Sequence, residues 1–462
     1  MKQFVFNEET EIEKEYVSRT AKSKTFDQTA CQYLPGGSTR SATDSHPYPI
    51  YMSSGKGCFL VDVDGNEYID FMNNYTVLIL GHVHPKVTQA VSEQIQEGIL
   101  LGAPSQSQYE LAQLICERIG SVDRIRFCNT GTEGVMYALR AARAITGRTK
   151  VVKMEGGFHG NTEQTEISVS PDLALAGPAE SPIPIPETPG VPQGVLQDIL
   201  VAPFNNIEAT KRIIHNNRKE VAAVIVEPVM GASGMIPAKK EFLKFLREIT
   251  TQNNIMLIFD EIITFRLSPG GYQAICDVRP DFTTFGKIIG GGFPIGAFGG
   301  REDIMDLFSP KRKNPMHHSG TFNGNAVTMA AGIAAMKEID DSLISNINKL
   351  GDKLRKGIQD LFNKKGIRGQ VTGIGSLMNI HFSTRSVVDL RSAKANWNSS
   401  VPIRDLLSLA LRNNGIYTPQ RVMLCISSPM TDKEIHQTLQ AFEESLGMLR
   451  PVMERNCPEL LI

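Results

Sequence analysis

The stretch from Asp260 to Gly300 constrains the fold more than any other part of the chain. It is preceded by an apolar run, Ile255 to Phe259, and that run stops on two carboxylates, Asp260 and Glu261. A short apolar run bounded in this way is typical of a strand buried on both faces of a parallel sheet. Because open α/β sheets bind ligands beyond the carboxyl ends of their strands, the two acids mark a candidate ligand site.

A lysine in a glycine-rich setting completes this candidate site. Lys287 lies 27 residues beyond Asp260, and glycines follow it at 290–292. Apolar and glycine-rich surroundings can desolvate a lysine and lower its pKa, which makes it a Schiff-base nucleophile. A lysine for an aldehyde and an acid for a pyridinium nitrogen favour pyridoxal 5′-phosphate (PLP) as cofactor. The alternative is a surface lysine before a flexible turn and an acid that caps a helix.

Three longer motifs resemble a known family: F-D-E-I-I-T-F-R at 259–266, P-D-F-T-T-F-G-K-I-I-G-G-G-F-P-I-G-A-F-G-G-R at 280–301 and S-G-T-F-N-G-N at 319–325. They are similar to class III aminotransferases, and most similar to the branch that contains glutamate-1-semialdehyde aminomutase and the β-amino-acid aminotransferases. The resemblance implies PLP fold type I, which is a large α/β domain with a mostly parallel sheet flanked by helices, plus a small α+β domain. It assigns catalysis to Lys287 and Asp260.

A phosphate site is predicted after the strand expected at 124–128. The sequence N-T-G-T-E-G follows, and then a helical pattern to about Ile145. Thr130, Gly131 and Thr132 therefore lie at a helix N-terminus, where free N–H groups and the helix dipole bind phosphate. An ordinary N-cap is the alternative. These three residues resemble the family's phosphate cup, with Thr130 in place of a serine.

The resemblance adds four further cofactor contacts. Phe158 occupies the position of the aromatic residue that stacks on the cofactor ring, and core packing is its alternative role. His159 beside it and Glu227, at the end of a strand expected at 221–226, are predicted near the cofactor. Thr321 is expected to reach the cofactor phosphate of a neighbouring subunit, which implies a homodimer with shared active sites.

Two arginines are candidates for substrate binding. Arg40 ends the loop P-G-G-S-T-R, which is similar to β-amino-acid aminotransferases that hold the substrate carboxylate with this arginine. Arg421 resembles the arginine with which aminotransferases accept a second carboxylate. Val422 stands where the aminomutases place a gating glutamate, which weighs against an aminomutase. The alternative for both arginines is a solvated loop position.

The function implied is transfer of an amino group from a β- or ω-amino acid to a 2-oxo acid, 2-oxoglutarate or pyruvate, by a ping-pong mechanism. The alternatives are an isomerase of the glutamate-1-semialdehyde 2,1-aminomutase type, which needs no second substrate, and a non-catalytic PLP-binding protein. Retention of both Lys287 and Asp260 argues against the last of these.

The chain of 462 residues is long enough for two domains. We expect an N-terminal segment of the small domain at 1–75, the large PLP-binding domain at 76–330 and the C-terminal small domain at 331–462. From about Ala326 the pattern becomes α+β: we expect an amphipathic helix through Met336, strand-like sequence from Val371 to Phe382, and a helix at 402–412. The proline-rich segment 171–198 is expected to form a loop.

Composition excludes several classes of protein. A net charge of -1 offers no field for nucleic acid or an anionic membrane, and no apolar run reaches the ~18 residues of a membrane span. Seven scattered cysteines without a C-x-x-C pair argue against a zinc site. The motif G-H-V-H-P at 81–85 suggests a metal site at His82 and His84, but two histidines with no nearby third ligand are more often structural, and the family that this chain resembles carries the motif without a metal. Met1 to Thr20 lacks the apolar core of a secretory signal, so a cytoplasmic enzyme is expected.

Overall fold

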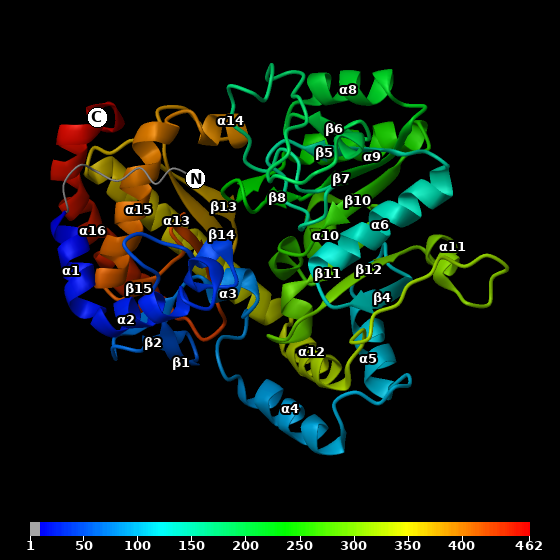
Figure 1. Ribbon diagram of the computed structural model, residues 1–462, viewed down its shortest axis with the longest axis horizontal. Coiled ribbons are helices and arrows are strands. Elements are labelled where there is room, and N and C mark those ends of the chain that lie inside the picture. The colour runs from blue at the N-terminus through cyan, green and yellow to red at the C-terminus, as the bar shows by residue number, and fades with distance from the viewer. Residues whose placement is uncertain (1–9) are drawn as a thin grey trace. The chain divides into compact units, whose positions relative to one another are not determined.

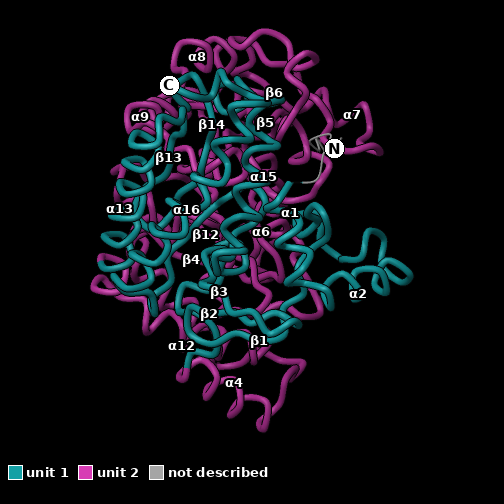
Figure 2. Tube along the Cα trace, turned by 90° about the vertical axis from the view of Figure 1, so that its left-hand side faces the viewer, with its two compact units in different colours: residues 1–84, 346–387, 392–462 teal, residues 85–345, 388–391 magenta. Residues whose placement is uncertain are grey.

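The computed structural model describes residues 10–462 (Figure 1). The chain divides into two compact units (Figure 2). The first unit contains residues 1–84, 346–387 and 392–462, and the second contains residues 85–345 and 388–391. The first nine residues, which belong to the predicted N-terminal segment, lie outside the described part. The domain limits predicted at 75 and 330 precede the divisions at 84 and 345 and stay predictions.

The second unit is built on one seven-stranded sheet, in the order β4-β12-β11-β10-β7-β5-β6. Within this sheet, β12 runs opposite to the other six strands, so the sheet is mostly parallel and the predicted α/β fold is confirmed. The strands of the sheet are β4 (Arg124–Cys128), β5 (Lys150–Met154), β6 (Ile199–Ala202), β7 (Val221–Val226), β10 (Met256–Asp260), β11 (Phe282–Gly286) and β12 (Gly296–Gly300); a small hairpin pairs β8 (Val229–Met230) with β9 (Ile236–Pro237).

Helices cover this sheet and its connections. They are α4 (Pro85–Glu97), α5 (Gln106–Cys116), α6 (Gly131–Thr146), α7 (Gln193–Leu196), α8 (Ile207–Asn216), α9 (Lys240–Gln252), α10 (Gly271–Cys276), α11 (Glu302–Met305) and α12 (Ala326–Glu338). The apolar side chains of α6 pack on β5, β7, β10, β11 and β12 in one buried core. Every residue of β7 is buried, as the uninterrupted apolar sequence predicts for a central parallel strand.

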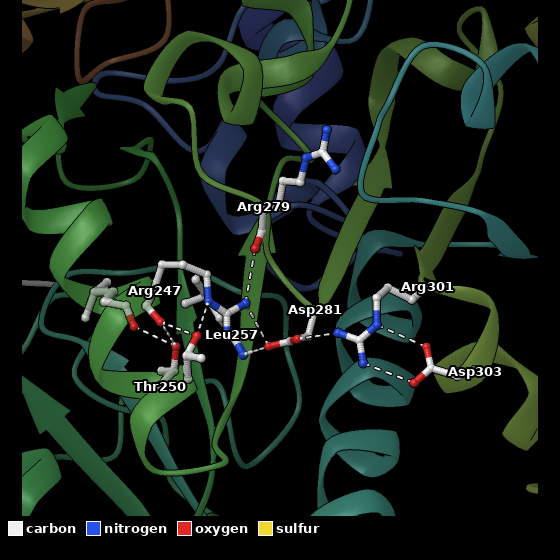
Figure 3. A network of polar contacts seen from close by, with 9 residues as sticks. Arg247, Thr250, Leu257, Arg279, Asp281, Arg301 and Asp303 are labelled. Carbon is white, nitrogen blue, oxygen red and sulfur yellow. Dashed lines mark hydrogen bonds and ion pairs between the residues drawn. The ribbon is translucent and has the colours of Figure 1, made fainter.

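The amino-terminal ends of β10 and β11 are joined by a charged network (Figure 3). Asp281, the residue before β11, is buried and accepts hydrogen bonds from the Leu257 amide at 2.8 Å and from Arg301 at 3.0 Å. Nη1 of Arg247 in α9 lies 3.0 Å from Oδ2 of Asp281, the oxygen that also accepts from the Leu257 amide. Arg301 in turn forms two hydrogen bonds to Asp303. One carboxylate therefore joins a helix, the starts of β10 and β11, and the end of the antiparallel β12.

The first unit contains a four-stranded sheet, in the order β1-β2-β3-β15, and a three-stranded sheet, in the order β13-β14-β16. Its elements are α1 (Glu11–Arg19), α2 (Ala21–Ala30), β1 (Met52–Lys56), β2 (Phe59–Asp62), β3 (Glu67–Asp70), α3 (Asn73–Thr76), most of α13 (Asp341–Lys364), β13 (Gly369–Ile374), β14 (Leu377–Phe382), α15 (Trp397–Asn413), β15 (Ile416–Tyr417), β16 (Met423–Cys425) and α16 (Asp432–Asn456). The short α14 (Leu390–Ala393) spans the last division between the units.

Two expectations about helices need correction. The helix α12 is not amphipathic: Ala326 to Met329 are four consecutive buried residues, which point in all directions around the axis. A helix that is apolar on every side is buried, and α12 belongs to the second unit rather than to the small domain. The helix predicted at 402–412 begins five residues earlier, at Trp397, with Pro402 inside it.

Among the described residues, no helix combines the length and the apolar character that crossing a membrane requires.

Candidate active site

The candidate cofactor residues of the second unit gather at one edge of its sheet. Six of the seven strands run in the same direction, so their carboxyl ends lie at the same edge. Five of these ends are followed, or formed, by candidate residues. They are Lys287 after β11, Asp260 at the end of β10, Glu227 after β7, Phe158 and His159 after β5, and Thr130 to Thr132 after β4.

The Asp260 carboxylate is buried and paired with a histidine. Its Oδ2 atom lies 2.8 Å from Nδ1 of His159, whose side chain is fully buried. Its Oδ1 atom accepts a hydrogen bond of 3.2 Å from the Ile262 amide. The other ring nitrogen of His159, Nε2, has no hydrogen-bond partner among the described residues. Two contacts thus fix the orientation of the Asp260 carboxylate.

Glu227 is a second buried acid beside this pair. Its Oε1 atom accepts a hydrogen bond of 2.7 Å from the Phe158 amide, and its Oε2 atom accepts one of 3.0 Å from the Gly231 amide. Burial is the largest cause that raises the pKa of the Glu227 carboxyl; His159 lowers this pKa and Asp260 raises it. Glu227 therefore fixes the backbone that carries Phe158, whose side chain is 42% exposed.

The predicted phosphate cup is also a capped helix start. The Thr130 hydroxyl accepts a hydrogen bond of 3.2 Å from the Glu133 amide, so the N-cap that the sequence allowed is present. The Glu133 carboxylate accepts from the amides of Asn129 and Thr130. The first-turn amides of Gly131 and Thr132 have no acceptor inside an α-helix. These two amides are the donors that the cup offers to an anion.

Close backbone packing shapes this cup. A Cβ atom on Gly296 of β12 would lie 1.8 Å from the Thr130 carbonyl oxygen, and one on Gly160 would lie 2.5 Å from the Thr132 hydroxyl. A Cβ atom on Gly131 would meet Ile262 at 2.4 Å. Glycine is thus required where β12 and the loop after β5 meet the helix start. That contact brings the phosphate cup beside the loop of Phe158 and His159.

Lys287 begins the turn that follows β11. Its backbone has a φ of 50°, in the left-handed region that L-residues rarely adopt. The side chain is neither fully buried nor fully exposed. A strained non-glycine residue of this kind is a candidate for function, because the surrounding structure must hold it in place.

The loop with the S-G-T-F-N-G-N motif is attached to the phosphate cup. Asn129 donates a hydrogen bond of 2.9 Å from Nδ2 to Oδ1 of Asn323, and Gln108 donates one of 3.0 Å to the Gly324 carbonyl oxygen. Thr321 itself is exposed. The predicted contact of Thr321 with a neighbouring subunit stays a prediction.

The two candidate substrate arginines belong to the first unit, where they share one aromatic ring. The guanidinium carbon of Arg40 lies 4.9 Å from the centroid of Tyr75, and that of Arg421 lies 5.2 Å from it. Nη1 of Arg40 also donates a hydrogen bond of 2.6 Å to Oδ1 of Asn74. Tyr75 donates one of 2.7 Å to the Ala42 carbonyl oxygen. Two guanidinium groups are thus held against a single ring, and their role in binding a substrate stays a prediction.

The backbone beneath Tyr75 is strained. Residues 73–76 all have positive φ values, between 46° and 77°. Left-handed conformations cost about 1–2 kcal/mol per residue, although asparagine tolerates them better. Val422, directly after Arg421, also has a positive φ, of 49°, and its side chain is fully buried. Both substrate arginines thus adjoin backbone that the fold holds in an unfavourable conformation.

Three residues that contact the candidate residues or adjoin them were not predicted from the sequence. Tyr75 and Asn323 are linked to predicted residues only by tertiary contacts, and Glu155 lies just before the loop of Phe158. For Tyr75 a signal did exist, because consecutive asparagines at 73 and 74 favour left-handed backbone.

Comparison with known proteins agrees with this geometry. The family model "Aminotransferase class-III" matches residues 40–446. The chain belongs to the class III aminotransferases.

Named relatives differ in their activity. A glutamate-1-semialdehyde 2,1-aminomutase of Methanothermobacter thermautotrophicus is 39% identical and covers 93% of this chain and all of the relative. A solved ω-transaminase from Sphaerobacter thermophilus is 40% identical, covers 93% and 98% of the two chains and has a TM-score of 0.89. A solved β-phenylalanine aminotransferase from Variovorax paradoxus is 37% identical, covers 96% and 97% and has a TM-score of 0.86.

The aminotransferase therefore uses pyridoxal 5′-phosphate, as its family does. The residues at the carboxyl edge of the sheet fit this cofactor: two first-turn amides for a phosphate, a buried carboxylate for a ring nitrogen, a half-exposed aromatic ring and a lysine. The substrates of the family are amino acids and 2-oxo acids.

Proposed function

We propose that this aminotransferase moves an amino group from a β- or ω-amino acid to a 2-oxo acid, 2-oxoglutarate or pyruvate, in two half-reactions. The observation that carries the proposal is the pair of guanidinium groups on Tyr75, since Arg40 and Arg421 together suit substrates with one or two carboxylates. The names of the ω-transaminase and the β-phenylalanine aminotransferase support the donor class.

Each residue at the sheet edge has a role in this proposal. The amides of Gly131 and Thr132, with the Thr130 hydroxyl, hold the cofactor phosphate, and Phe158 lies on the cofactor ring. The Asp260 carboxylate keeps the ring nitrogen protonated, and His159 keeps that carboxylate oriented. When bound, pyridoxal phosphate supplies an aldehyde for the amino group and a ring that accepts an electron pair.

Lys287 performs the proton transfer. Its Nζ atom would hold the cofactor through the aldehyde that pyridoxal phosphate supplies, and would remove the proton from the substrate carbon as a general base. The same Nζ atom would return that proton as a general acid, in the half-reaction with the amino donor and in that with the 2-oxo acid. Arg40 orients the carboxylate of the donor, and Arg421 orients the second carboxylate when 2-oxoglutarate is the acceptor.

We also propose a homodimer in which Thr321 of one protomer completes the phosphate site of its partner. Large apolar side chains are exposed around its loop: Ile99, Leu100, Leu101, Tyr109 and Phe322. Hydrogen bonds from Ala326 to the Ile99 carbonyl oxygen and from Gln108 to Gly324 place these segments together. An exposed apolar surface of this kind is typical of a subunit interface.

An aminomutase of the glutamate-1-semialdehyde type is the second candidate, because the relative from Methanothermobacter has that activity by name. Such an isomerase returns the amino group to the same molecule and needs no acceptor. The buried, apolar Val422 at the predicted gate position weighs against it, since valine supplies no carboxylate there.

A single-turnover absorbance experiment separates the two candidates. The holoenzyme is mixed with α-, β- and ω-amino acids without acceptor, and then with 2-oxoglutarate or pyruvate. For an aminotransferase, a β- or ω-amino acid bleaches the cofactor band and a 2-oxo acid restores it. An aminomutase instead converts an amino-aldehyde or diamino acid to its isomer with no acceptor present.

Two variants test the assignment of the arginines. Arg40→Lys should raise the Michaelis constant for the amino donor by roughly tenfold, because an ammonium group cannot bind a carboxylate through two parallel hydrogen bonds. Arg421→Lys should raise the Michaelis constant for the acceptor 2-oxoglutarate by a similar factor and leave that for pyruvate unchanged. Pyruvate is the internal control, since it lacks the second carboxylate.

A further inference from the structure

Four residues of the C-terminal part of the chain, 388–391, belong to the second unit, although the residues on both sides belong to the first. Within the second unit, Asn205 donates a hydrogen bond of 3.0 Å from Nδ2 to the Val388 carbonyl oxygen. Leu390 is buried. The segment 388–391 is therefore held at Val388 by a hydrogen bond and at Leu390 by burial. Its last residue is Arg391.

Arg391 is the most strongly bound side chain of the segment. Its Nε and Nη2 atoms donate parallel hydrogen bonds of 2.7 and 2.8 Å to the two carboxylate oxygens of Glu155. The side chain of Glu155 is only 4% exposed. Arg391 also donates to the carbonyl oxygens of Gly177 and Ala176, at 2.9 and 3.3 Å. One guanidinium group thus joins the end of β5 to the proline-rich segment 171–198.

Glu155 is the first residue of the loop that carries Phe158 and His159. The next residue, Gly156, has a φ of 90°, and a Cβ atom there would lie 2.4 Å from Oγ of Ser233 and 3.0 Å from Cβ of Leu390. The Ser233 hydroxyl donates a hydrogen bond of 2.6 Å to the Gly156 carbonyl oxygen. The loop therefore leaves β5 between Ser233 and the anchored segment, with little room to shift.

We propose that Arg391 is a positioning residue for the cofactor ring: through Glu155 it holds the loop of Phe158 and His159 in place and ties the proline-rich segment against it. This inference rests on the proposed roles of Phe158 and His159. Arginine is suited to the task because its planar fork satisfies a carboxylate and two carbonyl oxygens at once, whereas lysine offers a single ammonium group. Small displacements of a supporting loop change ligand affinity and rate strongly.

The chain supplies a matched control for this contact. Arg301 and Asp303 form the same two-bond pair, at 3.0 and 3.1 Å, at the opposite edge of the sheet (Figure 3). The variants Arg391→Lys and Arg301→Lys therefore remove the same kind of interaction in the same unit. Only Arg391→Lys should change how fast the cofactor is released.

The test follows the release of pyridoxal phosphate from the holoenzyme after dilution, by the absorbance of the bound cofactor, and the cleavage of residues 171–198 by a protease. Arg391→Lys should release the cofactor about tenfold faster than the wild type, the scale found when supporting contacts of a site are removed. It should also be cleaved faster in the proline-rich segment. Arg301→Lys should match the wild type in both measurements.

Two further variants distinguish an error in the proposed ring contact of Phe158 from an error in the positioning role of Arg391. Glu155→Gln, which keeps the side-chain shape, should repeat the effect and replaces Arg391→Lys if that variant does not fold. Phe158→Ala should also release the cofactor faster. If Phe158→Ala has no effect, the proposed ring contact is wrong; if only Arg391→Lys and Glu155→Gln have none, the ring contact stands and the positioning role is wrong.

Discussion

The two ends of the central strands carry buried aspartates with opposite kinds of neighbours. At the amino-terminal end, Asp281 is contacted by two arginines, each at 3.0 Å, and by the Leu257 amide. At the carboxyl end, Asp260 is contacted by His159, and its charge raises the pKa of a second buried acid, Glu227. Burial is nearly equal, at 6% and 4% exposure, so the difference lies in the partners.

This contrast separates a structural carboxylate from one prepared for a ligand. Buried charges in a stable fold are normally paired with opposite charges. Asp281 follows that rule with permanent cations. Asp260 and Glu227 are buried together beside one histidine, which is an arrangement that a cationic ring nitrogen would stabilise. The contacts of Asp281 hold the amino-terminal end together, and under the proposed function the unfavourable electrostatics at the carboxyl end serve to bind the cofactor.

The largest expected effect comes from removing the lysine of the carboxyl end. Lys287→Ala should lower turnover by at least about 10⁴-fold, because the variant loses the amine that transfers the proton. Covalent attachment of the cofactor should be lost, and the unfolding temperature should stay within a few degrees of the wild type. The control is Lys150→Ala at the amino-terminal end of β5, where the lysine only pairs with Glu220 at 2.9 Å. Substantial turnover by Lys287→Ala would contradict the assignment.

The next effect in size should come from Asp260→Asn. The amide keeps the shape but not the charge that stabilises a protonated ring nitrogen, so kcat should fall about 10³-fold. Stability should not fall, because an acid beside the buried Glu227 is neutralised. The measurements are kcat and the unfolding temperature, with activity restored when the variant is loaded with N-methylated cofactor, whose ring charge is permanent. Full activity of Asp260→Asn with the ordinary cofactor would remove Asp260 from the catalytic residues.

Asp281→Asn should lower the stability of the fold and leave catalysis unchanged, which is the reverse of the result expected for Asp260→Asn. Arg247 would lose its carboxylate partner and Arg301 would keep only Asp303, so the free energy of unfolding should fall by about 2 kcal/mol; this is below the cost of breaking a fully buried pair because Arg301 is half exposed. Urea unfolding measures the loss, and kcat and cofactor release should be unchanged. If Asp281→Asn released the cofactor faster, the two ends of the strands would not be independent.

The sequence predicted the parallel strands and the residues at their carboxyl ends better than it predicted β12 and α12. Apolar runs that end on an acid or a lysine identified β7, β10 and the residues beyond them, because a buried parallel strand leaves that pattern. The antiparallel β12 was not predicted: G-A-F-G-G has few side chains to show a period, and its glycines are there to approach the phosphate cup. The sequence predicted that α12 has a single apolar face, because its small alanine and glycine residues between the larger apolar ones look like the solvent-facing positions of an amphipathic helix.

Contacts between distant residues were beyond the sequence. Arg391 and Glu155 are separated by 236 residues, and neither stands in a motif. The shared ring of Tyr75 could not be inferred either, because its position depends on the left-handed backbone at 73–76. Thr130 was correctly placed at a helix start, but its capping box with Glu133 takes two amides that a bound anion would otherwise use.

The smallest expected effect concerns the two lysines of β5. Lys150 lies at the amino-terminal end in an ion pair, whereas Lys153, near the carboxyl end, is buried and donates a hydrogen bond to the Ile167 carbonyl oxygen. Burial lowers the pKa of Lys153 to about 8 from its ordinary 10.5, against the opposing carboxylates of Glu227, Glu187 and Glu155. Stability should therefore show a pH dependence that disappears when Lys153 is replaced.

The direction follows from the protons bound in each state. Between about pH 8 and 10.4 the unfolded chain holds the proton of Lys153 and the folded protein releases it, so the contribution of this lysine to the free energy of unfolding rises with pH. Below pH 8 both states are protonated and the cost of burying the charge is present in full. From pH 7 to 9 the wild type should gain about 1 kcal/mol relative to Lys153→Met. Urea unfolding at several pH values measures the gain. If Lys153→Met ran parallel to the wild type, Lys153 would keep its ordinary pKa, and its burial would have to be compensated fully by the three glutamates around it.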